Sequence, residues 1–180
     1  MDLVDRLART RIGSTHNQYA RSPLRRERLR AYLEQHATAP VILVGEAAGY
    51  RGARISGVPF TSERQLTGTG TAEASATIVH RVLGELDAER RVILWNTVPH
   101  HPHHPERPLS NRRPTQGEVE AGAAFAERLL ELVQPRQLVA VGRIAESVLG
   151  ERAVYVRHPA NGGGAAFAAG MAQLLTDGER

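Results

Sequence analysis

Four short apolar runs, separated by stretches with helical periodicity, limit the folds that this chain can adopt. The runs are Val41–Val44, Val92–Trp95, Leu138–Val141 and Ala153–Val156. Each is apolar on both faces, which is typical of strands in a parallel sheet covered by helices on both sides. The alternation of strands and helices predicts a three-layer α/β/α sandwich with a central, mainly parallel four-stranded sheet and right-handed crossovers.

Spacing and capping residues predict the helices between these strands. The clearest signal is at residues 115–133, because Thr115 and Glu118 form a capping-box pattern and Pro135 follows the apolar face. Apolar residues at helical spacing predict three further helices, over 71–86, 144–149 and 165–175.

Residues 1–36 are predicted to form a helical N-terminal lead-in to a single domain that spans residues 1–180. Ser22 is a candidate N-cap with Pro23 directly after it, and residues 22–35 contain three leucines interspersed among four arginines. We interpret it as a solvated helix packed by its leucines. An arginine face for a phosphate-bearing partner is the alternative.

The charge of the chain favours phosphate-bearing partners. All 23 basic residues are arginine, the net charge is +4 and the isoelectric point is near 10.3. A basic surface attracts polyanions through counterion release. Coding bias in a GC-rich genome is the alternative explanation for the absence of lysine.

Several classes of protein are excluded by composition. The chain has no cysteine, which excludes disulfides, thiolate catalysis and a cysteine-ligated iron–sulfur cluster. No apolar run approaches the roughly 20 residues that span a bilayer, so no membrane partner is expected. The charged N-terminus lacks a hydrophobic signal segment, and a cytoplasmic protein is therefore expected.

Polar side chains follow three of the predicted strands at the points where they end. The first strand runs into a glycine-rich turn containing Glu46, Asn96 ends the second, and His158 follows the last. Open α/β sheets bind ligands at this carboxyl edge. Phe60, after Gly-Val-Pro, is one of only three phenylalanines. The sequence therefore predicts a pocket containing a carboxylate, an aromatic ring, an amide and an imidazole.

In chain order, these motifs resemble those of the uracil-DNA glycosylase superfamily. Gly-Glu-Ala-Ala-Gly at 45–49 resembles the first motif, which reads GEAPG in several branches. Residues 57–60 resemble the segment whose ring stacks on the extruded base. Asn96 stands where the family has its base-reading asparagine, and His158-Pro159 where it has its second catalytic motif. The resemblance covers roughly residues 40–175, with the middle region matched at 111–115 and 141–145.

The resemblance implies a DNA glycosylase that removes uracil, or other deaminated bases, from DNA in base excision repair. Such an enzyme extrudes the nucleotide from the base stack into a pocket. The implied catalytic residues are Glu46 and His158. The implied base-binding residues are Gly45, Ala47, Phe60 and Asn96, and the implied DNA contacts are Arg112, Arg113, Asn161 and Gly162. No cofactor or metal is implied, and we expect a monomer whose partner is DNA containing uracil or another damaged base.

Departures from the family pattern leave alternatives open. Ala47 stands where the best-known branch has its water-activating aspartate, and Ala48 replaces the proline of GEAPG. Residues 160–164 offer no large apolar side chain to wedge into a duplex. Either Arg157, Asn161 or the flexible backbone takes that role, or single-stranded DNA is the preferred substrate. A non-catalytic module that binds damaged DNA and a hydrolase of free nucleosides are the alternative functions.

Each candidate also has a structural interpretation when it is considered alone. Phe60 is then a core residue, Asn96 caps a loop, His158 is a hydrogen-bonded structural histidine and Glu46 pairs with an arginine. All four residues occur in the same order along the chain as the family's motifs, which favours the interpretation that they form one site.

The His/Pro-rich loop at residues 99–114 and the glycines at 162–164 suggest other ligands. The prolines at 99, 102 and 105 favour an extended backbone that scatters the four imidazoles of the cluster at 100–104, so we expect a DNA-facing loop without a metal site. The glycines lack the lysine of a P-loop and the spacing of a dinucleotide fingerprint, so no nucleotide cofactor is expected.

Overall fold

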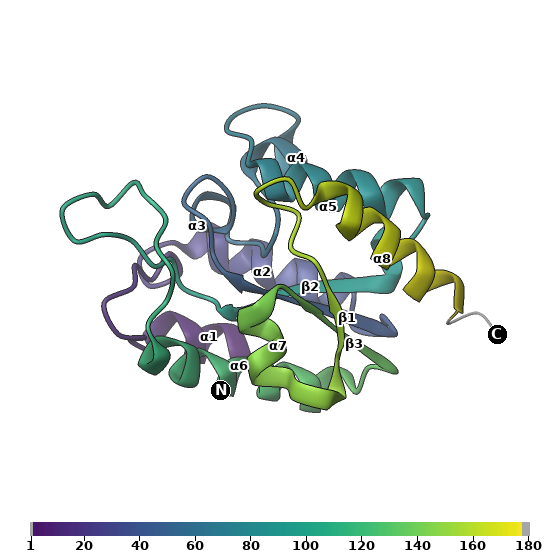
Figure 1. The fold of residues 1–180 in the computed structure, drawn as a ribbon. Coiled ribbons are helices and arrows are strands. Elements are labelled where there is room, and N and C mark those ends of the chain that lie inside the picture. Colours follow the sequence, from purple (N-terminus) through teal and green to yellow (C-terminus); the bar gives the residue numbers. More distant parts are fainter. Residues whose placement is uncertain (1, 178–180) are drawn as a thin grey trace.

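A four-stranded, all-parallel sheet forms the centre of the molecule. The structure, a computed structural model, describes residues 2–177, and the ends of the predicted 1–180 domain lie outside this part. The strand order is β2-β1-β3-β4. The strands are β1 Val41–Ala47, β2 Val92–Val98, β3 Gln137–Val141 and β4 Val154–Val156. The predicted three-layer α/β/α sandwich is confirmed (Figure 1).

Helices cover both faces of the sheet, and alternate strand residues point into two cores. One face is covered by α1 Leu3–Arg9, α2 Pro23–Gln35, α6 Gln116–Val133 and α7 Arg143–Leu149. The other is covered by α5 Ala74–Glu85 and α8 Gly164–Asp177. In β1, Ile42 and Val44 face the first core while Val41 and Leu43 face the second. This period-2 alternation is why the strands are apolar throughout.

The connection from β1 to α5 contains two short helices that the sequence did not predict. They are α3 Ala53–Ser56 and α4 Glu63–Thr67. Helices of this length show too little apolar periodicity to be recognised. Two 3-10 turns, η1 Glu89–Arg91 and η2 Gly150–Arg152, precede β2 and β4.

The two helix starts predicted from capping residues are confirmed, whereas the helix expected from residue 71 begins at Ala74. The Ser22 hydroxyl accepts a hydrogen bond from the N–H of Arg25 at 3.3 Å at the start of α2. At the start of α6, Thr115 Oγ1 accepts from the N–H of Glu118 at 3.3 Å, and Glu118 Oε2 accepts from the N–H of Thr115 at 2.9 Å. These bonds satisfy amide groups that the first turn of a helix leaves unpaired.

The arginines of α2 have intramolecular partners. Arg28 pairs with Glu63 at 2.8 Å, and Arg30 pairs with Asp2 at 2.6 Å. Leu29 is fully buried, but Leu24 is 54% exposed, so the leucines pack the helix only in part. This pairing favours the structural interpretation of the lead-in. Among residues 2–177, no helix combines the length and apolar character needed to cross a membrane.

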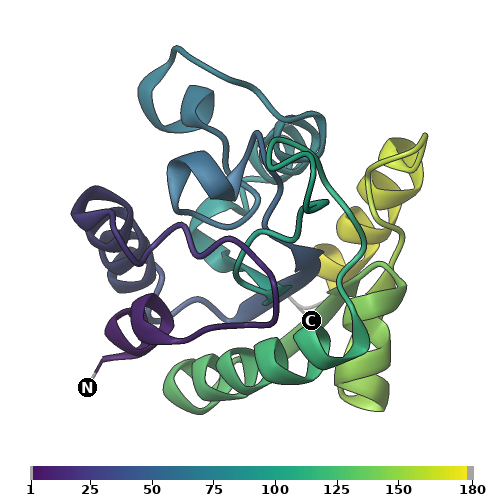
Figure 2. The ribbon, with the colours of Figure 1, turned by 90° about the vertical axis from the view of Figure 1, so that its left-hand side faces the viewer.

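The N-terminal segment anchors the long loop that follows β2. His16 and His101 exchange two backbone hydrogen bonds, of 2.8 and 3.0 Å, and Gln18 Nε2 donates to the carbonyl of Pro99 at 2.7 Å. Figure 2 shows this segment and the loop on the side of the molecule that faces the viewer. The loop at residues 99–114 has no helix or named strand, as predicted, and the N-terminal segment holds its base beside the sheet.

Candidate active site at the carboxyl edge of the sheet

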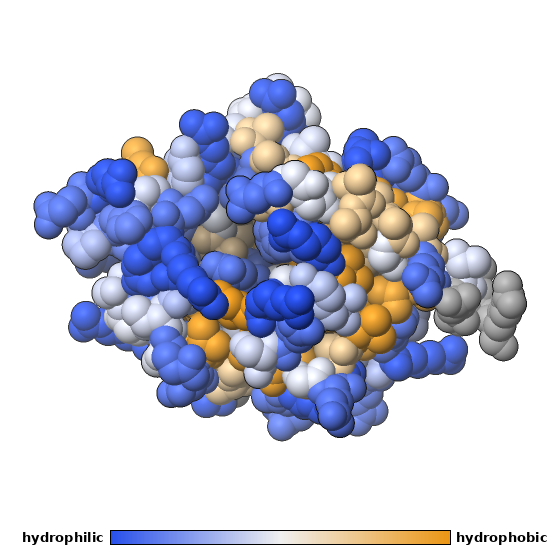
Figure 3. Space-filling model, in the orientation of Figure 1, coloured by the Kyte–Doolittle hydropathy of each residue, from blue (hydrophilic) through white to orange (hydrophobic). Residues whose placement is uncertain are grey.

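A cavity of about 570 Å³ opens at the carboxyl edge of the sheet. Hydrophilic residues gather around a recess near the centre of the face seen in Figure 3. The cavity brings together five of the predicted catalytic and base-binding residues, Glu46, Ala47, Phe60, Asn96 and His158. The sixth, Gly45, is the register partner of Asn96 between β1 and β2. The sheet topology thus joins motifs that are more than 100 residues apart in the chain.

The Phe60 ring lies against the backbone of Gly45. A Cβ atom at Gly45 would lie 2.1 Å from Phe60 Cζ, so only glycine admits the ring at this point. Phe60 has a positive φ of 49°, an uncommon conformation for a bulky residue. Its ring centroid lies 6.2 Å from that of His158. Phe60 is both a core residue, 7% exposed, and a wall of the cavity.

Asn96 presents a buried amide to the cavity. It is 3% exposed, and its side chain makes no hydrogen bond with any residue in the described part of the chain. The loop-capping interpretation requires such a bond. Thr97 Oγ1 instead donates to the carbonyl of Gly45 at 2.9 Å and ties the two strand tips together. The Asn96 amide therefore keeps a donor and an acceptor for a ligand.

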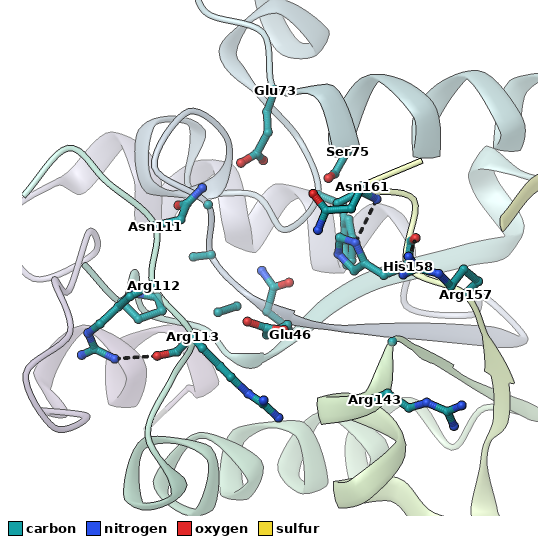
Figure 4. Close-up of a pocket in the computed structure, with 18 of the residues that line it drawn as sticks. Glu46, Glu73, Ser75, Asn111, Arg112, Arg113, Arg143, Arg157, His158 and Asn161 are labelled. Carbon is teal, nitrogen blue, oxygen red and sulfur yellow. Dashed lines mark hydrogen bonds between the residues drawn. The ribbon is translucent and has the colours of Figure 1, made fainter. Parts of the chain in front are cut away.

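The tautomer of His158 follows from its backbone contact. Nδ1 accepts a hydrogen bond from the N–H of Ala160 at 3.1 Å, drawn as a dashed line in Figure 4. Burial, assisted by Arg157, lowers the pKa of His158 below its usual value of 6.5. The ring is therefore neutral at pH 7 and carries its proton on Nε2. Gly163 shapes this turn, because a Cβ there would lie 2.0 Å from the His158 carbonyl oxygen.

Glu46 is a half-buried carboxylate at the end of β1. Burial raises the pKa of Glu46, and the positive charge of Arg113 opposes this rise. The turn after Glu46 has no proline, but two hydrogen bonds fix it. The N–H of Ala48 donates to the carbonyl of Val98 at 3.2 Å, and His101 Nδ1 donates to the carbonyl of Ala48 at 2.7 Å.

Sequence reasoning missed a second carboxylate, Glu73, and gave no role to Asn111. The Glu73 carboxylate lies against the backbone of Gly49 and Gly52, where added Cβ atoms would come within 1.8 and 2.0 Å of it. Burial raises the pKa of Glu73. Asn111 Oδ1 accepts from the N–H of Tyr50 at 2.9 Å. Both residues line the cavity, and in Figure 4 Glu73 lies across it from Arg113 while Asn111 lies between the two. No sequence motif marks Glu73, because only the folded loops bring it here, whereas Asn111 lies in the segment 111–115 that resembles the family's middle region.

Arg112 is committed to an intramolecular ion pair. Its Nη1 and Nη2 each donate to Glu118 at 2.7 Å, and its Nε donates to the carbonyl of His103 at 2.8 Å. This pairing lowers the pKa of Glu118 to about 2. The geometry favours a structural role for Arg112 over the DNA contact predicted for it.

The other predicted DNA contacts lie at or beside the mouth of the cavity. Arg113 and Asn161 line it, and both are exposed. Gly162 is exposed in the same turn as Asn161, with a φ of 77°. Sequence reasoning gave no base-site role to Arg143, Tyr155 and Arg157, which also line the cavity.

The histidine cluster is largely structural. His100 and His101 are fully buried, so this part of the loop does not face DNA as expected. His100 Nε2 lies 3.3 Å from the carbonyl of Leu7. His103 Nδ1 lies 3.0 Å from the carbonyl of His104. Within residues 2–177, no group of three or more His, Asp or Glu side chains is placed to hold a metal ion.

Comparison with known proteins agrees with this geometry. Residues 33–172 match the uracil DNA glycosylase superfamily. Among solved structures, the fold is similar to wild-type SMUG2 of Pedobacter heparinus, with 13% identity, a TM-score of 0.64 and 98% of each chain covered. It is also similar to wild-type UNG from Nitratifractor salsuginis, with 18% identity, a TM-score of 0.51, and 83% of this chain and 78% of that chain covered. At such identities these two structures show a shared fold. No curated protein sequence matches the chain. Because the family match spans most of its length, the chain belongs to the uracil DNA glycosylase superfamily.

Proposed function

We propose that this protein is a monofunctional DNA glycosylase that hydrolyses the N-glycosidic bond of deoxyuridine in DNA and leaves an abasic site. One observation carries the proposal. A single cavity holds an aromatic wall, a buried amide whose side chain has no hydrogen-bond partner among residues 2–177, and an imidazole whose proton is on Nε2. In the reaction, the oxygen of water bonds to C1′ of the sugar, the bond from C1′ to N1 breaks, and uracil leaves as an anion with the electron pair. The water gives up one proton to solvent as it bonds, and the uracil anion takes one up after release.

Phe60 and Asn96 select the base. The extruded base stacks on the Phe60 ring, a contact worth about 1–3 kcal/mol. The Asn96 amide donates to uracil O4 and accepts from N3–H. Cytosine presents the opposite pattern at both positions, so the same amide orientation rejects it.

His158 stabilises the leaving group. Negative charge grows on uracil O2 as the glycosidic bond breaks, and the Nε2–H of His158 donates to that oxygen. Preorganised donors of this kind often make the largest contribution to catalysis. Since the Ala160 N–H already fixes the ring, no reorganisation is needed when the bond breaks.

Glu46 acts through its charge. As a carboxylate, it orients the attacking water or steadies the positive charge that develops on the sugar. Both roles require the ionised form. Arg113 supports that form by opposing the effect of burial on the pKa of Glu46.

The rim of the cavity binds the DNA backbone. Arg113 and Arg157 are exposed there, and the net charge of +4 adds a general attraction for DNA. Asn161 and Gly162 offer polar backbone and side-chain groups beside them. We expect binding to weaken as salt rises, whereas affinity for a free nucleoside would stay nearly constant.

An excision assay tests the proposal. The protein is incubated with single- and double-stranded oligonucleotides containing uracil, and abasic sites are cleaved by alkali and counted. Parallel substrates carry hypoxanthine, xanthine or thymine opposite guanine, with His158→Ala and Asn96→Ala as controls. Uracil release that depends on both residues supports the proposal, and no release from any substrate overturns it. Ala47, which stands where the best-known branch has its aspartate, favours a second candidate function, a non-catalytic module that binds damaged DNA. Tight binding of uracil-DNA without an abasic product would select it.

A further inference from the structure

The rim of the cavity carries a stacked guanidinium and phenol that the proposed reaction does not use. Arg143, at the start of α7, places its guanidinium carbon 4.5 Å from the centroid of the Tyr155 ring in β4. Arg143 Nη1 also donates to Glu146 Oε2 at 2.7 Å. The Arg143 side chain is nevertheless 75% exposed. A planar cation is thus held in one place with much of its surface open to solvent.

This arrangement differs from that of an arginine placed to bind phosphate. Glu146 partly neutralises the charge of Arg143, which weakens attraction to the DNA backbone. Arg157, on the same rim, has no carboxylate partner in the described residues and is exposed. A guanidinium plane stacks well on a nucleobase even when its charge is compensated. Arg143 is therefore suited to a base, and Arg157 to a phosphate.

The position of the pair relates it to the extruded nucleotide. Gly142, directly before Arg143, packs against His158, because an added Cβ would lie 3.2 Å from the His158 Cβ. Figure 4 shows Arg143, Arg157 and His158 on the same side of the cavity. Residues 160–164 offer no apolar side chain larger than the methyl group of Ala160 to fill the gap that extrusion leaves in the base stack. A neighbouring base that loses its stacking partner needs a new surface.

We propose that Arg143 and Tyr155 form a stacking platform for the nucleobase adjacent to the extruded nucleotide. The inference rests on the proposed function, since it assumes that a base enters the cavity. In a duplex the adjacent base remains paired with its complement and is costly to move. The platform therefore favours single-stranded or locally unpaired DNA.

Removing one base while keeping its phosphate tests the platform. The probe is a single-stranded oligonucleotide containing 2′-fluoro-deoxyuridine, in which the fluorine disfavours positive charge at C1′ and slows hydrolysis. In two further probes, the nucleotide on the 5′ or the 3′ side is an abasic spacer. Affinity is measured by fluorescence anisotropy over a series of salt concentrations for the wild type, Arg143→Lys, Tyr155→Leu and Arg157→Gln.

We expect wild-type affinity to fall roughly 5- to 100-fold on one side when the base is missing, as for loss of one stacked base. Arg143→Lys keeps the charge but loses the plane, so it should bind the complete and abasic probes almost equally. Tyr155→Leu should behave similarly. Arg157→Gln should keep the base dependence but lower the slope of log affinity against log salt by about 0.7, as for one phosphate contact on a single strand.

Two results would overturn the platform while leaving the glycosylase proposal intact. One is a wild-type protein that excises uracil but binds all three probes equally. The other is an Arg143→Lys variant that keeps the full dependence on the adjacent base, which would make Arg143 a simple charge contact. Failure of the wild type both to excise uracil and to bind the uracil probe would overturn the glycosylase proposal and the platform together.

Discussion

The Nδ1 atom of His158 lies 3.1 Å from the backbone nitrogen of Ala160 and accepts a hydrogen bond from its N–H. This contact decides how the histidine acts. A ring that accepts at Nδ1 carries its proton on Nε2, and burial keeps it neutral by lowering the pKa. Protonation of Nδ1 would place two N–H groups face to face. In the proposed reaction, His158 would therefore serve as a neutral hydrogen-bond donor rather than as an acid.

His158→Ala should lower the single-turnover rate of uracil excision about 10²- to 10³-fold, as for loss of one oxyanion donor. Substrate affinity should change much less, since the charge on O2 develops only as the bond breaks. The comparison uses rates at saturating enzyme and affinities from anisotropy. An unchanged rate would remove His158 from the mechanism.

Asn96→Ala should lower the excision efficiency for uracil by roughly 5- to 100-fold, because a paired donor and acceptor to a base edge contribute about 1–3 kcal/mol. Asn96→Asp should lose more, since a carboxylate has no proton to donate to O4. Both variants should retain general DNA affinity at low salt. Full activity of Asn96→Ala would contradict the proposed role of Asn96 in recognising the base.

Gly45→Ala should displace the Phe60 ring, because the new Cβ would lie 2.1 Å from Cζ. We expect a loss of about 1–3 kcal/mol in the free energy of unfolding and a rise in KM for uracil-DNA. Gly117→Ala is the matched control, since no atom lies within 4 Å of its added Cβ. The control should keep its KM and be equally or more stable. Equal KM values for the two variants would contradict the role of the Phe60 ring as a wall of the base-binding cavity.

Glu46 should set an acidic limit on the excision rate. Its pKa is raised above 4.5 by burial, so the rate should fall as the pH drops through a midpoint above that value. Arg113→Gln removes the charge that opposes this rise and should move the midpoint to higher pH. His158 titrates in both the wild type and Arg113→Gln, so the difference between their two midpoints reports on Glu46. A midpoint that stays fixed or moves down in Arg113→Gln would contradict this assignment.

Acid should destabilise the fold through the two buried histidines that follow β2. The pKa values of His100 and His101 are lowered to about 4 by burial. Between pH 6.5 and about 4, the unfolded chain binds protons that the folded chain does not, so stability falls as pH falls. Each histidine contributes up to about 1.4 kcal/mol per pH unit. Urea denaturation at pH 7.5 and 5 measures this change. His101→Asn, which keeps a donor for the carbonyl of Ala48, should reduce the loss of stability between pH 7.5 and 5. A loss as large as in the wild type would contradict the prediction.

Local sequence determined much of the framework. Apolar runs with a period of two give strands, and Ser22, Thr115 and Glu118 cap helices through contacts within three residues. Such signals can be recognised in the sequence because they depend on residues that are close together in the chain. Parallel strands also bring their carboxyl ends to one edge, so the meeting of Glu46, Asn96 and His158 was predictable from order alone.

The tertiary structure decided the use of each remaining side chain. Arg112 follows a motif that suggests a DNA contact, yet Glu118 holds it in a buried pair. Glu73 enters the cavity only because the glycines at 49 and 52 leave space for its carboxylate. His101 is buried against Ala48, 53 residues away in the chain. These roles depend on contacts between distant segments, and a side chain's type and local neighbours do not specify which segment the fold places beside it.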